Sequence, residues 1–141
     1  MKNYNLRPFH LAFPVKDLMK TKKWYTKYLN CTVGRESDSW IDFNLYGHQI
    51  VAHLSKSKKK YEANEVDNKN VPIQHFGVIL SFKDWEKLSK NLKKHNINFL
   101  ISPCNRFKNK KGEQHTLFIT DPSGNAIEFK SFKNDSMIFE H

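Results

Sequence analysis

The chain reads as two successive copies of one pattern, and this internal repeat restricts the fold more than any other feature. Each copy begins with a short apolar run of strand composition, continues with an amphipathic helix and ends with further strand-like runs. The first copy comprises residues 9–13, 18–29, 39–46 and 49–55. The second comprises residues 73–80, a helix from Ser81 to residues 95–96, and residues 99–101, 116–120 and 125–132. A unit that cannot cover its own sheet must pack with its twin, which predicts a cavity built from both copies.

Local signals set the ends of these segments. Pro14 is expected to end the first strand, and Asp17 to cap the first helix. Ser81, with an acid three residues later, resembles a capping pair for the second helix. Residues 30–34 read as a turn, and residues 121–124 place Pro and Gly where a tight turn requires them.

The expected organisation is a single domain, because 141 residues suffice for one hydrophobic core. We predict an α+β fold in which two paired β-α-β-β-β modules form curved sheets around a metal cavity. Module 1 covers about residues 7–55 and module 2 about residues 71–133. Residues 56–70 are charged, rich in Asn and nearly free of aliphatic side chains, which predicts a linker, and residues 134–141 form a tail.

Three polar residues lie inside apolar strand-like runs. Placing one copy over the other puts His10 on His75, and Glu128 lies in the last run. Such residues avoid burial unless they are paired or ligated. Two imidazoles and a carboxylate suit a divalent metal, with Fe(II) favoured and Mn(II), Zn(II) or Ni(II) as alternatives. Two residues beyond the histidines lie Ala12 and Gly77, whose small size would leave space beside the rings. The competing interpretation is three hydrogen-bonded polar residues of the core.

The formal charge of +10 raises the question of nucleic-acid binding. The lysines gather at residues 56–60 and 108–111 and are otherwise spread along helices and loop ends, without an aromatic–basic recognition motif. We therefore expect no nucleic-acid partner, and a positive field that favours an anionic small-molecule substrate.

Location is inferred from what the sequence lacks. No run approaches the roughly 20 apolar residues that span a bilayer, and residues 1–7 lack a signal-peptide segment. Cys31 and Cys104 are then expected to be free thiols rather than a disulfide. A cytoplasmic protein without membrane association is the expectation.

The chain from about residue 9 to 132 resembles the vicinal oxygen chelate superfamily, which includes glyoxalase I, extradiol dioxygenases, and fosfomycin and bleomycin resistance proteins. The strings that carry the resemblance are FHLA at 9–12, VKDL at 15–18, WY at 24–25, HFGV at 75–78 and DPSGNAIEF at 121–129. More narrowly, the chain resembles a bacterial subgroup of predicted extradiol-type dioxygenases. The strings that carry this resemblance are WIDF at 40–43, GHQ at 47–49, AHL at 52–54 and GEQ at 112–114.

The resemblance implies roles for individual residues. His10 and His75 match the family's histidine ligands, and Glu128 matches its carboxylate ligand. His53 lies near the end of the fourth strand, where extradiol enzymes keep an acid–base histidine. Glyoxalase I has a fourth ligand on that strand, but the residue matching Glu128 in the first copy is Val51, which puts a fourth ligand in doubt.

The resemblance also implies a reaction class with open alternatives. The expected function is a dioxygenase-like metalloenzyme whose substrate chelates the metal through vicinal oxygens. Dioxygenases of this class carry a tyrosine where this chain has Phe118, which weakens the case for ring cleavage. A glyoxalase-type isomerase or lyase, and a non-catalytic binding protein like the bleomycin resistance members, remain alternatives. His115, Phe118 and Arg106 are expected in the substrate pocket, and a homodimer is expected from the relatives.

Overall fold

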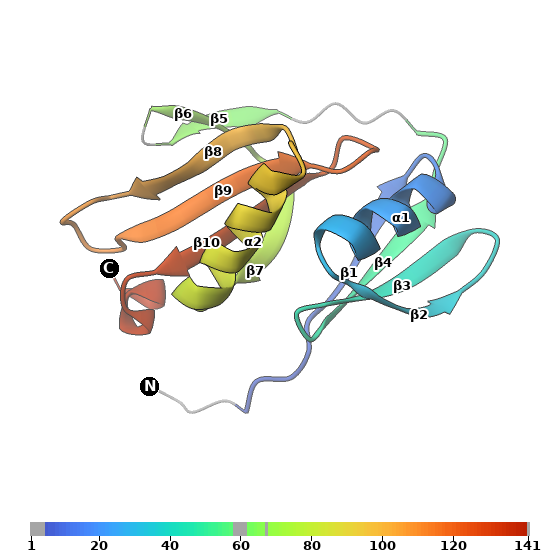
Figure 1. Ribbon diagram of the computed structural model, residues 1–141, viewed down its shortest axis with the longest axis horizontal. Coiled ribbons are helices and arrows are strands. Elements are labelled where there is room, and N and C mark those ends of the chain that lie inside the picture. Colours follow the sequence, from blue (N-terminus) through green and yellow to red (C-terminus); the bar gives the residue numbers. More distant parts are fainter. Residues whose placement is uncertain (1–4, 58–61, 67, 141) are drawn as a thin grey trace. The chain divides into compact units, whose positions relative to one another are not determined.

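The computed structural model describes residues 5–57, 62–66 and 68–140, which form two compact units, residues 1–57 and 58–141 (Figure 1). Each unit is described by itself. Residues 58–61 and 67 of the expected linker, including lysines of the 56–60 cluster, and residue 141 of the expected tail lie outside the described residues.

Unit 1 is a four-stranded sheet with one helix on it. Its elements are β1 (His10–Val15), α1 (Leu18–Tyr28), β2 (Thr32–Glu36), β3 (Trp40–Leu45) and β4 (His48–Leu54). The strand order is β1-β4-β3-β2, with β1 parallel to β4 and the other pairs antiparallel. Asp17 caps α1 as expected, its carboxylate accepting from the Lys20 amide at 2.8 Å.

The core of unit 1 lies between the sheet and α1. The ring of Tyr25, fully buried, lies 5.7 Å from Phe13 and 5.1 Å from Phe43 between ring centroids. Residues alternate along β1, so Phe13 and Val15 are buried while His10 and Ala12 are exposed. The helix thus covers one face of the sheet, and His10 lies on the other.

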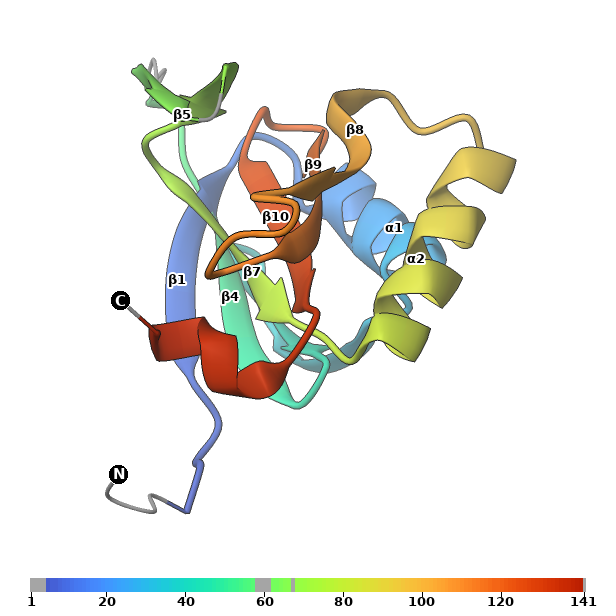
Figure 2. The same ribbon diagram turned by 90° about the vertical axis from the view of Figure 1, so that its left-hand side faces the viewer.

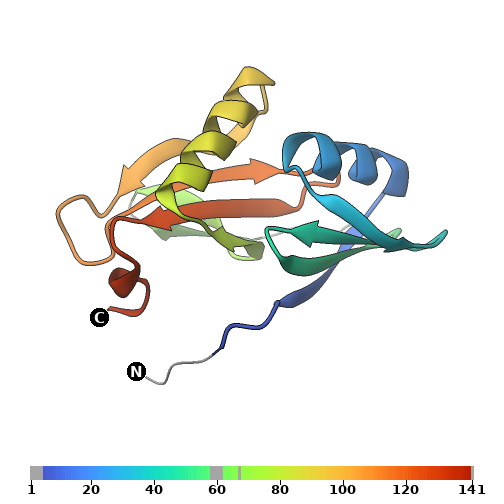
Figure 3. The ribbon, with the colours of Figure 1, turned by 60° about the horizontal axis from the view of Figure 1, so that its bottom comes forward.

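Unit 2 repeats this arrangement. Its elements are β7 (His75–Ile79), α2 (Phe82–Lys94), β8 (Phe99–Arg106), β9 (Gln114–Thr120) and β10 (Ala126–Phe132). The order is β7-β10-β9-β8, with β7 parallel to β10 (Figure 2). Figure 3 shows α2 lying along one face of this sheet, where its buried Trp85, Leu88 and Leu92 pack.

The two registers match at the residues singled out by the repeat. Gly77 pairs with Glu128 in unit 2, and Ala12 pairs with Val51 in unit 1. A Cβ added to Gly77 would overlap the main-chain carbonyl of Glu128, so the glycine permits close approach of β7 and β10. The prediction of two β-α-β-β-β modules in an α+β fold is confirmed.

Several local predictions were wrong. Residues 30–34 were expected to be a turn, but β2 begins at Thr32. Gly34 lies close to β3, since a Cβ added to it would lie 3.3 Å from the Asp42 Cβ. Pro14 does not end β1, because β1 is an edge strand and the missing N–H faces away from the ladder.

The second unit and the linker also differ from expectation. β8 extends to Arg106, with Pro103 tolerated on an edge strand that carries register shifts. The expected linker contains a hairpin of β5 (Ala63–Val66) and β6 (Lys69–Pro72), where Asn68 adopts a positive φ of 58° suited to its side chain. The expected tail holds a 3₁₀ helix, η1 (Asp135–Phe139). Among the described residues, no helix has the length and apolar character needed to cross a membrane.

Candidate metal centre

A cluster of polar side chains joins β7 to β10 on the face opposite α2. The Nε2 atom of His75 lies 3.2 Å from Oε2 of Glu128. Glu128 is 5% exposed, and His75 is half-buried. The register explains the contact, because His75 pairs with Ala126 and therefore shares a face with Glu128 two residues later.

The ring of His75 is held in one orientation. Its Nδ1 donates to the main-chain carbonyl of Pro72 at 2.6 Å. The edge of the ring packs against Phe118 with centroids 5.0 Å apart, and Phe118 in turn packs with Val71 and Ile101. Because a carbonyl only accepts, the neutral ring carries its proton on Nδ1 and presents the Nε2 lone pair toward Glu128.

Both oxygens of Glu128 are engaged, in different ways. Thr116 on β9 pairs with Lys130 on β10, and its hydroxyl donates to Oε1 of Glu128 at 2.6 Å. The ammonium of Lys130 lies 3.4 Å from Oε2, the oxygen that His75 also approaches. Thr116 thus fixes the carboxylate, and Oε2 is the atom turned toward cationic partners.

These contacts shift the protonation of the pair in opposite directions. The hydrogen bond to Glu128 raises the pKa of His75 above its ordinary value, against a smaller opposing effect of burial. Burial alone would raise the pKa of Glu128, but hydrogen bonds from His75 and Thr116 and the charge of Lys130 together lower it. Without a metal, the two side chains therefore form an ion pair over a widened pH range.

In unit 1, His10 is oriented by a chain of side chains that crosses the sheet. Its Nδ1 donates to Oε1 of Gln49 at 2.8 Å. The amide nitrogen of Gln49 lies 3.4 Å from Oδ2 of buried Asp42, and Arg35 Nε lies 3.4 Å from the same oxygen. One residue comes from each of β1, β4, β3 and β2. Since Asp42 accepts from the amide nitrogen, the amide oxygen of Gln49 must face His10.

The two histidines therefore share a feature that suits metal ligation. Each Nδ1 is bound to an oxygen acceptor, which leaves Nε2 as the ligand atom, the usual arrangement around metal-bound histidines. The 3.2 Å between His75 Nε2 and Glu128 Oε2 fits two neighbouring ligands of one ion, which lie roughly 3 Å apart when each bond is about 2.1 Å. The two donors of unit 2 thus match part of the ligand set of a divalent metal.

A complete site within one unit is not found. Across residues 5–57, 62–66 and 68–140, no group of three or more His, Cys, Asp or Glu side chains is placed to hold an ion. The predicted triad takes His10 from unit 1 and the other two ligands from unit 2. Its assembly remains a prediction.

His53, the expected acid–base residue, lies on β4 and is exposed. It pairs with Trp40 on β3 and Pro14 on β1, and it shares a face with Val51, two residues earlier. Val51 occupies the register position of Glu128, so the structure places an apolar side chain where a fourth ligand would lie in unit 1.

The three residues expected to line the substrate pocket have different surroundings. Phe118 is fully buried against the His75 ring. His115 lies on the α2 face of β9, with its ring centroid 4.9 Å from Phe82 and 5.3 Å from Trp85. Arg106 is buried, and its Nη2 donates to the Val66 carbonyl at 3.0 Å. The geometry favours packing roles for His115 and Arg106, and places Phe118 against the ring of His75.

Some residues of the candidate site were not predicted from the sequence, because their contacts depend on which residues pair across the sheet. Gln49 and Thr116 act across strands on His10 and Glu128, and sequence spacing alone does not show which residues pair. Lys130 carried a readable signal, since strand alternation puts residue 130 on the face of residue 128.

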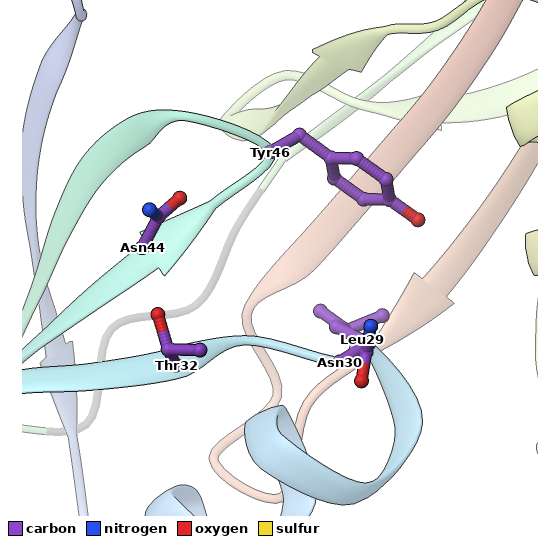
Figure 4. Close-up of a pocket in the computed structure, with 5 residues that line it drawn as sticks. All are labelled: Leu29, Asn30, Thr32, Asn44 and Tyr46. Atoms are coloured by element: carbon purple, nitrogen blue, oxygen red, sulfur yellow. The ribbon is translucent and has the colours of Figure 1, made fainter.

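A separate pocket of about 260 Å³ lies in unit 1, where α1 ends and β3 turns into β4 (Figure 4). Its lining residues are Leu29, Asn30, Thr32, Asn44 and Tyr46. No imidazole, carboxylate or thiol is among them, so this hollow supplies no metal ligand.

The match to known proteins decides the family. A sequence model of the Glyoxalase/Bleomycin resistance protein/Dioxygenase superfamily matches residues 7–129.

The chain belongs to this superfamily.

Members of the superfamily include metalloenzymes and resistance proteins. A glyoxalase/bleomycin resistance protein/dioxygenase from Alicyclobacillus acidocaldarius is 33% identical, with 99% of this chain and 100% of that chain covered and a TM-score of 0.80. An integron cassette protein from the mobile metagenome of a Halifax Harbour sewage outfall is 24% identical, with coverage of 94% and 100% and a TM-score of 0.68. The fosfomycin resistance protein FosX of Listeria monocytogenes is 16% identical, with coverage of 91% and 93% and a TM-score of 0.67. The last two likenesses show the fold alone.

Proposed function

We propose that this superfamily member is a metal-dependent, dioxygenase-like enzyme whose ligands are His10, His75 and Glu128. The observation that carries the proposal is the orientation of the two imidazoles. Gln49 and Pro72 each accept a hydrogen bond from the Nδ1–H of one ring, and His75 Nε2 lies 3.2 Å from Glu128 Oε2. The same 3.2 Å contact serves as an ion pair in the metal-free protein and as the spacing of two ligands when a metal is bound.

The proposed substrate binds through two adjacent oxygens, as in a diol or enediolate. When bound, a divalent ion would supply Lewis acidity, lowering the pKa of a substrate hydroxyl and holding both oxygens. The chain's residues do the rest. Thr116 keeps Glu128 in place, Phe118 keeps water from one side of the His75 ring, and His53 accepts or returns the substrate proton. Two histidines and one carboxylate favour Fe(II), with Mn(II), Zn(II) and Ni(II) as alternatives.

The reaction class is tested by oxygen consumption. Protein purified without chelators and reconstituted with Fe(II), Mn(II), Zn(II) or Ni(II) is supplied with a panel of catechols in an oxygen electrode. The proposal predicts substrate-dependent oxygen uptake with Fe(II). Turnover of a thiohemiacetal without oxygen uptake would instead identify a glyoxalase-type isomerase or lyase, a rival that Phe118 favours because it cannot donate a hydrogen bond to substrate.

A non-catalytic binding protein would behave differently in the same preparations. Such a protein needs no metal, so its ligand affinity would survive chelation and the substitution His10→Ala. The proposal predicts loss of ligand binding in both cases, because the substrate would be held through the metal.

A further inference from the structure

A cation lies beside the proposed metal ligands of unit 2. Lys130 is two residues beyond Glu128 on β10 and therefore lies on the same face of the sheet. Its Nζ is 3.4 Å from Glu128 Oε2, and its side chain is 30% exposed to solvent. Because Thr116 engages Oε1, Lys130 and His75 approach the same remaining oxygen.

A divalent ion at this oxygen would weaken its contact with Lys130. The ammonium and the ion carry like charge and would repel each other at a separation of a few ångströms. A metal that binds Oε2 would therefore displace the ammonium of Lys130. The main chain of Lys130 lies in β10, so its ammonium stays within one side-chain length of this face of the sheet.

The displaced ammonium finds no acid on the strands beside it. The residues paired with Lys130 are Thr116 on β9 and Ile79 on β7, neither of which carries a negative charge. An ammonium with this exposure can be hydrated, but a hydrogen-bonded anion stabilises it more strongly. An anionic substituent on a molecule bound beside Glu128 would supply such a partner.

We propose that Lys130 is the substrate-recognition residue of this site, pairing with Glu128 before the metal binds and with an anionic substituent of the chelating substrate afterwards. The inference rests on the proposed function and deepens it: the substrate carries a carboxylate or similar anion in addition to its vicinal oxygens. Lys130 is expected to set substrate preference and to compete with metal entry.

The test uses two ligands that differ in charge alone. Both 3,4-dihydroxybenzoate and 3,4-dihydroxybenzamide present the same diol and an electron-withdrawing carbonyl, but only the benzoate has an anion. Their dissociation constants are measured on Co(II)-loaded protein from the visible spectrum of the metal. The Co(II) affinity of the metal-free protein is measured by competition with a chelator, a readout independent of activity.

Three variants separate the role of Lys130 from general charge. Lys130→Met removes the ammonium, and Lys130→Arg keeps a cation. Lys133→Met is the matched control, because Lys133 follows the same strand but pairs with Glu113 at 3.3 Å, away from the proposed ligands. Far-UV circular dichroism checks that each variant is folded.

Wild-type protein is expected to prefer the benzoate by about tenfold or more, the effect of one charge-assisted hydrogen bond. Lys130→Met should reduce this preference to about twofold and tighten Co(II) binding by roughly fivefold or more. Lys130→Arg and Lys133→Met should keep the preference. An unchanged preference in Lys130→Met would overturn the assignment while Co(II) binding stands. Wild-type protein that binds no Co(II) would instead refute the proposed function, and the role of Lys130 with it.

Discussion

The Nε2 atom of His75 lies 3.2 Å from Oε2 of Glu128, between two parallel strands that approach closely because Gly77 has no side chain. The opposite nitrogen of the ring donates to Pro72, and the opposite oxygen of the carboxylate accepts from Thr116. Each partner is thus held from behind, and the atoms facing each other are those a metal would use. This pre-orientation would favour metal binding.

Gln49 should control metal affinity without touching the metal. Its amide oxygen accepts from His10 Nδ1 at 2.8 Å and so fixes which ring nitrogen is available. Gln49→Leu is expected to weaken metal binding roughly 10- to 100-fold, the usual effect of losing such a partner. Isothermal titration calorimetry with Co(II) measures the change. Equal metal affinity of Gln49→Leu and wild type would contradict this role.

The pKa of His75 in the metal-free protein should exceed that of a free histidine. Its hydrogen bond to Glu128 raises this pKa, whereas burial opposes the shift. Replacing Glu128 by Gln removes the leading cause, so the pKa of His75 should fall. Titration of the imidazole Cε1–H resonance by NMR measures both values. A His75 pKa at or below the free value in the wild type would contradict the ion pair.

The same shifts define a pH window for stability and for metal binding. The raised pKa of His75 stabilises the fold fully below about pH 6.5, a contribution lost as pH rises through the folded-state value. The lowered pKa of Glu128 stabilises it above about pH 4.3, a contribution lost as pH falls. The metal-free pair thus contributes most between these limits. Metal competes with the His75 proton, so metal affinity should rise with pH above that window.

Gly77 should be intolerant of a methyl group. A Cβ there would overlap the Glu128 carbonyl, so β7 and β10 would have to separate. Gly77→Ala is expected to lower the free energy of unfolding by roughly 1–3 kcal/mol and to weaken metal binding. Urea unfolding measures the first effect. Gly34→Ala is the milder comparison, since its Cβ would lie 3.3 Å from the Asp42 Cβ rather than overlap a main-chain carbonyl. Equal midpoints for Gly77→Ala and wild type would disprove the close-approach argument.

The two thiols should react at very different rates. Burial raises the pKa of the Cys31 thiol to about 12, so its thiolate fraction at pH 8 is on the order of 10⁻⁴. Cys104 is half-buried. Ellman's reagent should therefore modify one thiol quickly in native protein, and Cys104→Ser should abolish this phase while Cys31→Ser leaves it intact. A fast phase that survives Cys104→Ser would show that Cys31 is accessible.

The sequence predicted the fold well because the repeat has strong periodic signals. The helix caps at Asp17 and Ser81 were predicted from residue type alone. The Asp17 carboxylate and the Ser81 hydroxyl each accept a hydrogen bond from a main-chain amide three residues later, as expected. β2 was missed because it is an exposed strand with Gly34 at its centre, which resembles a turn. β8 was predicted too short because Pro103 lies within it, and only its edge position makes a proline acceptable there.

The sequence pointed to the residues of the candidate site but not to the side chains that support them. His75 and Glu128 were found from polar residues in apolar strands, and the structure brings this pair together. Thr116 and Gln49 depend on which residues face each other across a ladder, information that a one-dimensional pattern does not hold. His115 was expected in the substrate pocket but lies on the other face of the sheet. It precedes Thr116 on β9, and because side chains alternate along a strand it faces α2 rather than Glu128.

The central claim is that His10, His75 and Glu128 bind one ion together. The most direct measurement is the Fe(II) content of anaerobically reconstituted protein after removal of loosely bound metal, determined by mass spectrometry for wild type and single alanine variants. The account predicts one iron per wild-type chain, a retained iron in His53→Ala, and loss of iron in His10→Ala, His75→Ala and Glu128→Ala. Full iron content in any of these three, at wild-type affinity, would contradict it.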